Sequence, residues 1–187
     1  MEPPSPWIVR FAPLLPEGPV LDVAAGAGRH TRYFLDLGFD VLAVDRDLSG
    51  MQDLKGHPRL EVLEADLEDG RPFPLKGRMF AAVVVTRYLY RPILPDLVSA
   101  VGRGGVLLYE TFAAGNERFG KPRNPDFLLK PGELLDAVRG RLRVLAYEDL
   151  VVDHPAPAAI QRIAALNEGA TLTRGAGSDP GSRLSPS

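Results

Sequence analysis

The chain has 187 residues, of which 45% are hydrophobic and 25% are charged, as is usual for one globular domain with a sizeable core. The formal net charge is −2 and the pI is about 5.9, so long nucleic acid is not an expected partner. There is no cysteine, which excludes disulfides, thiolate zinc sites and cysteine nucleophiles.

The N-terminal residues, Met-Glu-Pro-Pro-Ser-Pro-Trp, lack the basic segment and apolar core of a signal peptide. No apolar run approaches the roughly 20 residues that span a bilayer, so no membrane partner is expected. We therefore expect a soluble cytoplasmic protein. The three histidines are dispersed along the chain, so we also expect no metal site.

From residue 20 to residue 112 the chain alternates short apolar runs with amphipathic segments. The apolar runs predict five strands, at 20–23, 39–44, 60–63, 79–85 and 106–112. The segments between them predict helices at 29–37, 48–54 and 94–101. Apolar strands that alternate with helices are typical of a parallel sheet covered on both faces. The predicted fold is therefore α/β, with a doubly wound and mostly parallel sheet.

The pattern changes after the fifth predicted strand. Residues 113–130 are rich in Gly, Asn, Arg, Lys and Pro and predict a loop, and a helix is expected to begin near Pro131. Two further strands are expected at about 142–152 and 158–166. The joint between them, 153–157, is too short for a parallel crossover, so these strands should form an antiparallel hairpin.

The last residues, 168–187, are mostly Gly, Ser, Pro, Arg and Asp without periodicity, and we expect them to form a disordered tail. Residues 1–167 are then one domain. The sequence has no internal repeat, and it leaves open whether the protein is a monomer or a homodimer.

The loop after the first predicted strand, in "LDVAAGAGR", contains two glycines, Gly26 and Gly28. Ligands of open α/β sheets bind beyond the carboxyl ends of the strands, so this loop is the first candidate site; a tight turn without a ligand is the alternative. The dinucleotide fingerprint needs a third glycine where Thr31 stands. The strand also contains Asp22, whose carboxylate would repel a pyrophosphate and would suit a cationic ligand.

Two further acids follow predicted strands. Asp45 ends the second strand, where an acid in nucleotide-binding folds accepts hydrogen bonds from ribose hydroxyls; a solvated strand-end acid is the alternative. Asp66 follows the third strand and could accept from an adenine amino group while Leu67 packs on the ring. A ligand with a ribose, an adenine and a cationic end, but no phosphate, is S-adenosylmethionine.

The segments "LDVAAGAGRHT", "VLAVDRD" and "EADLED" resemble the first three motifs of class I S-adenosylmethionine-dependent methyltransferases, in the same order and spacing. The resemblance spans about residues 15–166 and implies a seven-stranded Rossmann-like sheet that ends in an antiparallel hairpin. The stretch 109–135 resembles a bacterial subgroup of small methyltransferases near the tellurite-resistance and thiopurine methyltransferases.

The resemblance implies a role for individual residues. The methionine part of the cofactor would lie against the first strand and the glycine loop, and its adenosine part against the acids after the second and third strands. By motif match, the implied cofactor-binding residues are Asp22, Ala24, Gly26, Gly28, Asp45, Arg46, Asp66, Leu67 and Thr86. The acceptor is expected between residues 86 and 130, with Tyr88 and Glu110 as candidate catalytic residues. For the tyrosine, simple packing is the alternative.

The expected activity is in-line methyl transfer to a small-molecule acceptor. One alternative is a nicotinamide-dependent oxidoreductase, although no catalytic Tyr/Lys or His/Asp arrangement is recognisable; the other is a non-catalytic module that binds S-adenosylmethionine. The fourth motif reads "VTRYLYRP" and lacks the Asn/Asp-Pro-Pro-aromatic signature of enzymes that methylate amino groups of nucleic acids. The identity of the acceptor atom stays open.

Overall fold

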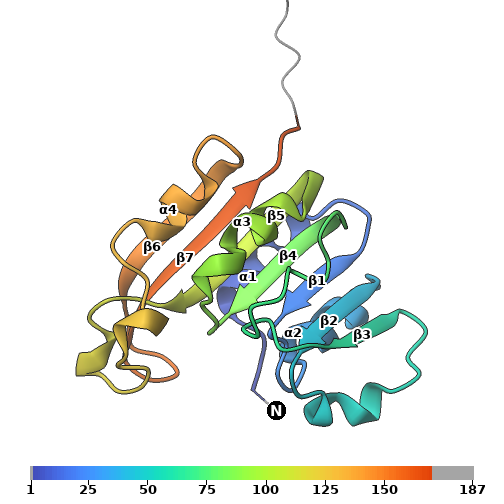
Figure 1. Ribbon diagram of the computed structural model, residues 1–187, viewed down its shortest axis with the longest axis horizontal. Helices are drawn as coiled ribbons and strands as arrows, with labels where there is room; N and C mark the ends of the chain where they lie inside the picture. The colour runs from blue at the N-terminus through green and yellow to red at the C-terminus, as the bar shows by residue number, and fades with distance from the viewer. Residues whose placement is uncertain (1, 170–187) are drawn as a thin grey trace, which may run out of the picture.

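Seven strands pair in one sheet in the computed structural model, which describes residues 2–169 (Figure 1). The order across the sheet is β3-β2-β1-β4-β5-β7-β6. The strands are β1 (Val20–Val23), β2 (Val41–Asp45), β3 (Leu60–Glu64), β4 (Phe80–Thr86), β5 (Val101–Phe112), β6 (Arg143–Val152) and β7 (Ala158–Leu166). The helices are α1 (Pro6–Phe11), α2 (Arg29–Asp36), α3 (Leu94–Ser99) and α4 (Glu133–Val138), and 3₁₀ turns lie at Ala12–Leu14, Ser49–Leu54, Arg91–Ile93, Asn116–Arg118 and Pro125–Phe127.

The first five strands are parallel, and β1 lies between β2 and β4. Val20, for example, is opposite Val41 on one side and Ala82 on the other. The chain leaves β1 toward β2 and β3 and later returns to the opposite side with β4, so the strand order reverses beside β1. In open α/β sheets a ligand binds at such a switch point, beyond the carboxyl ends of the strands.

The predicted hairpin is confirmed, because β6 and β7 are antiparallel. β7 also pairs antiparallel with β5, so the second strand of the hairpin lies inside the sheet and β6 forms its edge. The predicted fold class, a doubly wound and mostly parallel seven-stranded sheet that ends in an antiparallel hairpin, is therefore correct.

Alternate residues of the central strands face two separate hydrophobic cores. On one face Val84 and Leu108 pack with Trp7 of α1 and Phe34 of α2. On the other face the neighbouring strand residues pack with α3 and α4, through Leu97, Val98, Leu134 and Val138. Two helices thus cover each face, as continuous apolar strands require.

The predicted helix at 94–101 ends two residues early, at Ser99. The amide of Phe80 donates to the carbonyl of Ala100, and Val101 pairs with Phe80 as the first residue of β5. Tertiary strand pairing therefore overrides the local apolar pattern here. The helix expected at 48–54 is a 3₁₀ turn with a break at Met51.

The expected disordered tail lies outside the described residues except for Glu168 and Gly169, and Glu168 forms an ion pair with Arg143. Within residues 2–169, no helix is long and apolar enough to cross a membrane.

Candidate functional site

A cavity of about 440 Å³ opens at the carboxyl edge of the sheet, beside the switch point. Most of its lining residues directly follow a parallel strand, so residues far apart in the sequence meet there because the strands end together. The lining residues are Ala24, Asp45, Arg46, Ala65, Asp66, Leu67, Glu68, Arg87, Tyr88, Leu89, Thr111, Phe112, Pro122 and Phe127. We call this space the smaller cavity.

Two of these residues have a strained backbone. Ala24 and Arg87 both have φ of 53°, and within residues 2–169 no other residue except glycine has a positive φ. They follow the adjacent strands β1 and β4. Strained backbone conformations cluster at functional sites, where the surrounding structure holds them in place. Their position therefore supports a site at the smaller cavity.

The two glycines of the loop after β1 have different surroundings. Gly28 has φ of 76° and precedes α2, and a Cβ on it would lie 2.7 Å from side-chain atoms of Met51. Gly26 has φ of 56°, and a Cβ on it would meet no atom within 4 Å. Gly28 thus serves the packing of the loop, whereas the space beside Gly26 is open.

Asp45 connects the ends of β1 and β2. One carboxylate oxygen accepts from the amide of Gly26 at 2.7 Å, and the other accepts from the amide of Asp47 at 2.9 Å. A carboxylate offers about four lone-pair positions, so it can accept further hydrogen bonds from a ligand. Asp45 therefore both shapes the glycine loop and presents acceptors to the smaller cavity.

Asp66 and Leu67 lie on the wall that follows β3. One oxygen of Asp66 accepts from the amide of Glu68 at 2.9 Å, and the side chain is otherwise exposed. Leu67 is 8% exposed and joins the hydrophobic core below the cavity. A polar edge beside an apolar face is an arrangement that can hold an aromatic ring carrying an amino group.

The structure places Asp22 beneath the glycine loop and not on the wall of either cavity. The carboxyl is buried and accepts a hydrogen bond from Thr31 Oγ1 at 2.6 Å. Burial raises the pKa of Asp22 to about 6. Thr31, which stands where the dinucleotide fingerprint has its third glycine, is therefore the hydroxyl partner of this acid.

Tyr88 lines the smaller cavity, and its hydroxyl is buried without a hydrogen-bond partner in the described part of the chain. Burial raises the pKa of Tyr88, and the nearby carboxylates of Glu68 and Asp66 raise it further. The hydroxyl thus stays protonated and is a donor, not a general base. A buried polar group without a partner costs about 1–3 kcal/mol. The carboxylate of Glu68 lies near this hydroxyl but beyond hydrogen-bond distance, so a ligand atom can serve as the acceptor.

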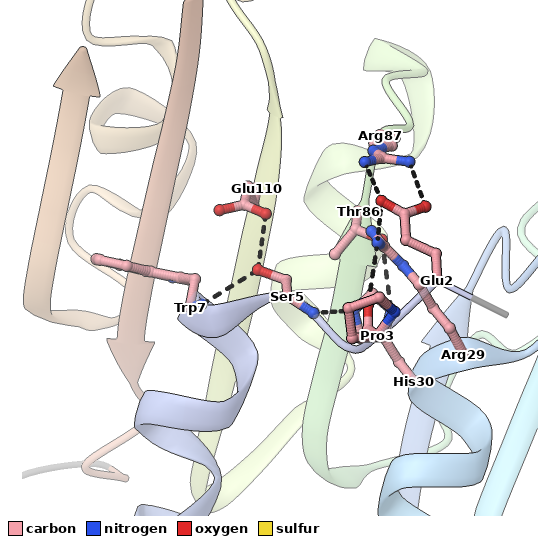
Figure 2. A network of polar contacts seen from close by, with 9 residues as sticks. All are labelled: Glu2, Pro3, Ser5, Trp7, Arg29, His30, Thr86, Arg87 and Glu110. Atoms are coloured by element: carbon pink, nitrogen blue, oxygen red, sulfur yellow. Dashed lines mark hydrogen bonds and ion pairs between the residues drawn. The ribbon is translucent and has the colours of Figure 1, made fainter. Parts of the chain in front are cut away.

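Thr86 ends β4 and lies next to the buried His30, with Thr86 Oγ1 and His30 Nδ1 3.4 Å apart. His30 Nε2 accepts from the amide of Ser5, so the ring proton is on Nδ1. Burial lowers the pKa of His30 to about 3, and the cations Arg29 and Arg87 lower it further. The ring is neutral and connects the end of β4 to the N-terminal segment (Figure 2).

A larger cavity, of about 1110 Å³, adjoins the first and shares Arg87, Thr111 and Phe112 with it. Its walls come from the N-terminal segment, the end of β5, the loop after β5 and the turn between β6 and β7. Glu110 lies here, where it accepts from Ser5 Oγ at 2.8 Å and pairs with Arg162 at 3.2 Å. The two candidate catalytic residues, Tyr88 and Glu110, therefore line different cavities.

The sequence analysis did not single out Glu2 or Ser5, which line the larger cavity. Glu2 lies between Arg87 and Arg29, and Ser5 bonds to Glu110 and His30 (Figure 2). No local motif marks these contacts, since Glu2 and Arg87 are 85 positions apart.

Within residues 2–169, no three His, Asp or Glu side chains come together in a way that could hold a metal ion.

No protein-family model and no curated protein matches the sequence. Solved structures do match, at low identity. TehB from Haemophilus influenzae is 18% identical with a TM-score of 0.68, over 86% of this chain and 61% of that one. The 1,6-didemethyltoxoflavin-N1-methyltransferase from Burkholderia thailandensis, with bound 1,6-didemethyltoxoflavin and S-adenosylhomocysteine, is 18% identical with a TM-score of 0.62, over 87% of this chain and 76% of that one.

A TehB-like methyltransferase from Corynebacterium glutamicum is also 18% identical, with a TM-score of 0.60 over 86% of each chain. The chain thus has the Rossmann-like fold of these methyltransferases, and it spans less than two thirds of the Haemophilus chain.

Proposed function

We propose that the chain is an S-adenosylmethionine-dependent methyltransferase that acts on a small-molecule acceptor, with residues 1–167 as its catalytic domain. One observation carries the proposal: the smaller cavity brings Asp45, Asp66 and Leu67 together at the switch point of a methyltransferase-like sheet. The Burkholderia methyltransferase of the same fold holds S-adenosylhomocysteine, which is the expected product form of the cofactor.

The residues present fit the cofactor. The unused acceptor positions of Asp45 suit ribose hydroxyls, the exposed edge of Asp66 suits an adenine amino group, and Leu67 offers an apolar face. The unpartnered hydroxyl of Tyr88 adds a donor to the same cavity. The glycine loop lacks the third glycine of the dinucleotide fingerprint, because Thr31 stands there and bonds to the buried Asp22 below the loop.

When bound, S-adenosylmethionine supplies an electrophilic methyl group on a sulfonium sulfur. In an in-line displacement, the acceptor atom forms a bond to the methyl carbon while the carbon–sulfur bond breaks and its electron pair stays on sulfur. The protein accelerates such a reaction mainly by holding both reactants in a near-attack geometry and excluding water. The two adjoining cavities supply this arrangement, one for each reactant.

Proton transfer is needed only if the acceptor is a hydroxyl or a protonated amine. The protonated Tyr88 cannot accept the proton and instead acts as a hydrogen-bond donor. Two carboxylates, Glu2 and Glu110, line the larger cavity. Glu110 has one oxygen on Ser5 and the other on Arg162 and, unlike Glu2, belongs to a strand of the sheet. We propose Tyr88 as a binding residue and Glu110 as the candidate base.

The proposal is tested by incubating the full chain with methyl-labelled S-adenosylmethionine and a panel of small thiols, phenols, amines and metalloid oxyanions. Transfer of label to an acceptor, lost in the Asp45→Ala variant, supports it. Tight binding of S-adenosylhomocysteine without transfer to any acceptor would favour a non-catalytic module. Binding of NADH in preference to S-adenosylhomocysteine would favour an oxidoreductase and would reject the proposal.

A further inference from the structure

Residues 2–4, which we call the N-terminal strap, line the larger cavity. The carboxylate of Glu2 makes two hydrogen bonds with the guanidinium of Arg87, at 2.8 and 2.5 Å, and an ion pair with Arg29 at 3.0 Å (Figure 2). A planar guanidinium recognises a carboxylate in this two-bond arrangement. The strap therefore shows what kind of group the two arginines bind.

The arginines around the larger cavity differ in which carboxylates they pair with. Arg162 pairs with Glu110 and Glu148, and Arg10 is 3.8 Å from Glu148. All four of these residues belong to α1 or to the sheet.

Arg29 and Arg87, by contrast, have Glu2 as their one carboxylate partner within the described residues. If the strap left, two neighbouring cations would remain without a carboxylate. Because Glu2 belongs to the N-terminal strap and not to the sheet, another anion can take the place of its carboxylate on Arg29 and Arg87.

The position of Arg29 supports this interpretation. It is the first residue of α2, where the helix dipole disfavours a cation, and its side chain is only 15% exposed. Burial and the nearby Arg87 lower the pKa of Arg29, whereas the carboxylates of Glu2, Glu110 and Asp22 raise it, so a nearby anion stabilises this cation. An anion between the two guanidinium groups offsets the unfavourable interactions of Arg29 with the helix dipole and with Arg87.

The strap can move without disturbing the fold. Ser5 is buried, caps α1 by accepting from the amide of Trp7 at 3.1 Å, and donates to Glu110. Trp7 and the rest of the inner face of α1 are buried in the core. Glu2 and Pro3 are exposed, and within residues 2–169 the polar contacts of the strap are those with Arg87 and Arg29. Ser5 is thus a fixed point from which residues 2–4 can swing.

The remaining walls of the larger cavity are mostly apolar. They include Val9, Phe112, Phe119, Val152 and Ile160, together with prolines of the strap and of the turn between β6 and β7. Phe119 is 42% exposed and Val9 is 40% exposed. An apolar body with a single anionic group would match both the walls and the two arginines.

We propose that the larger cavity binds an apolar small molecule that carries a carboxylate, and that this carboxylate replaces Glu2 on Arg87 and Arg29. The inference rests on the proposed function, in which this molecule is the methyl acceptor. Because both carboxylate oxygens are held by guanidinium groups, the carboxylate orients the acceptor and a different atom receives the methyl group. Glu2 then closes the site when the acceptor is absent.

We assign the carboxylate to the acceptor because the residues that hold it line the larger cavity, and the comparison of S-adenosylhomocysteine with 5′-methylthioadenosine below tests this against the methionine carboxylate of the cofactor. Arg29 and Glu2 line the larger cavity and not the smaller one, where Asp45 and Asp66 lie. Arg87 lines both cavities and so stands at their junction.

The test compares 2-naphthoate with its neutral analogue 2-naphthamide by isothermal titration on the full chain. The wild type should bind naphthoate more tightly than naphthamide. Glu2→Gln should tighten naphthoate binding about two- to fivefold, as expected for removing a partly exposed competing ion pair, and should leave naphthamide unchanged. Glu17→Gln removes the same charge from an exposed residue outside both cavities and should change neither.

Arg87→Gln should abolish the preference for naphthoate, and Arg29→Gln should reduce it if the Arg87 variant fails to fold. Equal binding of naphthoate and naphthamide by the wild type would overturn the proposal. So would a Glu2→Gln variant that binds naphthoate no better than the wild type does.

A second part of the experiment distinguishes a carboxylate of the acceptor from the carboxylate of the cofactor. S-adenosylhomocysteine carries a carboxylate in its amino-acid part, and 5′-methylthioadenosine lacks that part. If Glu2→Gln tightens binding of the first but not of the second, and leaves naphthoate unchanged, the arginines serve the cofactor and the proposal is wrong. If neither nucleoside binds but naphthoate behaves as expected, the proposed methyltransferase function fails while the carboxylate site stands.

Discussion

The two cavities differ in how the chain builds them. The smaller cavity is made mainly of residues that directly follow a strand, such as Ala24 after β1, Asp45 at the end of β2 and Tyr88 after β4. The larger cavity joins the N-terminal strap to the end of β5 and to the turn between β6 and β7, which are far apart in sequence. Local sequence therefore specifies the first site, whereas only tertiary contacts assemble the second.

This difference has a functional consequence. A site made from strand ends is fixed by the sheet and suits a ligand that is always the same, such as a cofactor. A site closed by a detachable segment can admit and release different molecules. The predictions below distinguish residues of the smaller cavity and its glycine loop that act on the cofactor from residues that act on the stability of the fold.

The largest effect is expected for Gly26→Val. A Cβ at Gly26 meets no protein atom within 4 Å, so the branched side chain would project from the glycine loop next to Asp45, to which the Gly26 amide donates, and would add backbone strain at φ of 56°. Affinity for S-adenosylhomocysteine should fall by on the order of 3 kcal/mol, the upper range for overpacking. Gly56→Val is the matched control, since Gly56 has φ of 82° and equally open space but, unlike Gly26, does not belong to the glycine loop that bonds to Asp45. Normal binding by a folded Gly26→Val variant would remove the loop from the site.

Asp45→Ala should weaken binding of S-adenosylhomocysteine by about 1–3 kcal/mol, because it removes acceptors for the ribose and the tie to Gly26. The control is Asp47→Ala, which also removes an Asp side chain that accepts an amide hydrogen bond in the same loop but does not line the cavity. Titration calorimetry should show a loss for the first variant and little change for the second. Equal losses in both would mean that loop order, not ribose contact, explains the effect.

Asp22 should make stability depend on pH. Its pKa is raised from 3.8 to about 6, so the folded state keeps a proton that the unfolded state releases. The free energy of unfolding should therefore fall as pH rises from about 4 to 6, by on the order of 1–3 kcal/mol relative to Asp22→Asn. Urea unfolding of both proteins between pH 4 and 7 measures this difference. A difference that does not change with pH would show that Asp22 is not a buried neutral acid.

The smallest effect on affinity is expected for Tyr88→Phe. Its hydroxyl is buried and has no partner in the described residues, so its loss should not lower the free energy of unfolding and should raise it by up to about 1–3 kcal/mol. Affinity for S-adenosylhomocysteine should fall by about 0.5–1.5 kcal/mol if the ligand accepts this hydrogen bond. Tyr109→Phe is the opposite control, since Tyr109 donates to the carbonyl of Tyr88 at 2.8 Å and its loss should lower stability instead. Unchanged affinity in Tyr88→Phe would leave the hydroxyl without a role in binding.

Much of the fold could be predicted from the sequence because the strands are short, apolar and regularly separated. The antiparallel hairpin followed from the short joint at 153–157 alone. The insertion of β7 between β5 and β6 could not be predicted, because strand order depends on pairing between distant segments. The end of α3 at Ser99 was missed for the same reason, since strand pairing at Val101 takes over from the local helical pattern.

The residues of the candidate site also differ in whether the local sequence identifies them. Asp45, Asp66 and Leu67 were identified by their position after a strand, and the structure brings them to one cavity. Asp22 belongs to the same motif, but the structure shows it buried against Thr31, which the motif does not reveal. Glu2 could not be found from local sequence, because its contact with Arg87 depends on how α1 packs on the sheet.

The central claim is that the smaller cavity holds the adenosine part of the cofactor. A crystal structure of the complex with S-adenosylhomocysteine tests it most directly. The account predicts the ribose hydroxyls within hydrogen-bond distance of Asp45 and the adenine against Asp66 and Leu67. A nucleoside bound elsewhere on the protein, with the smaller cavity empty, would contradict it.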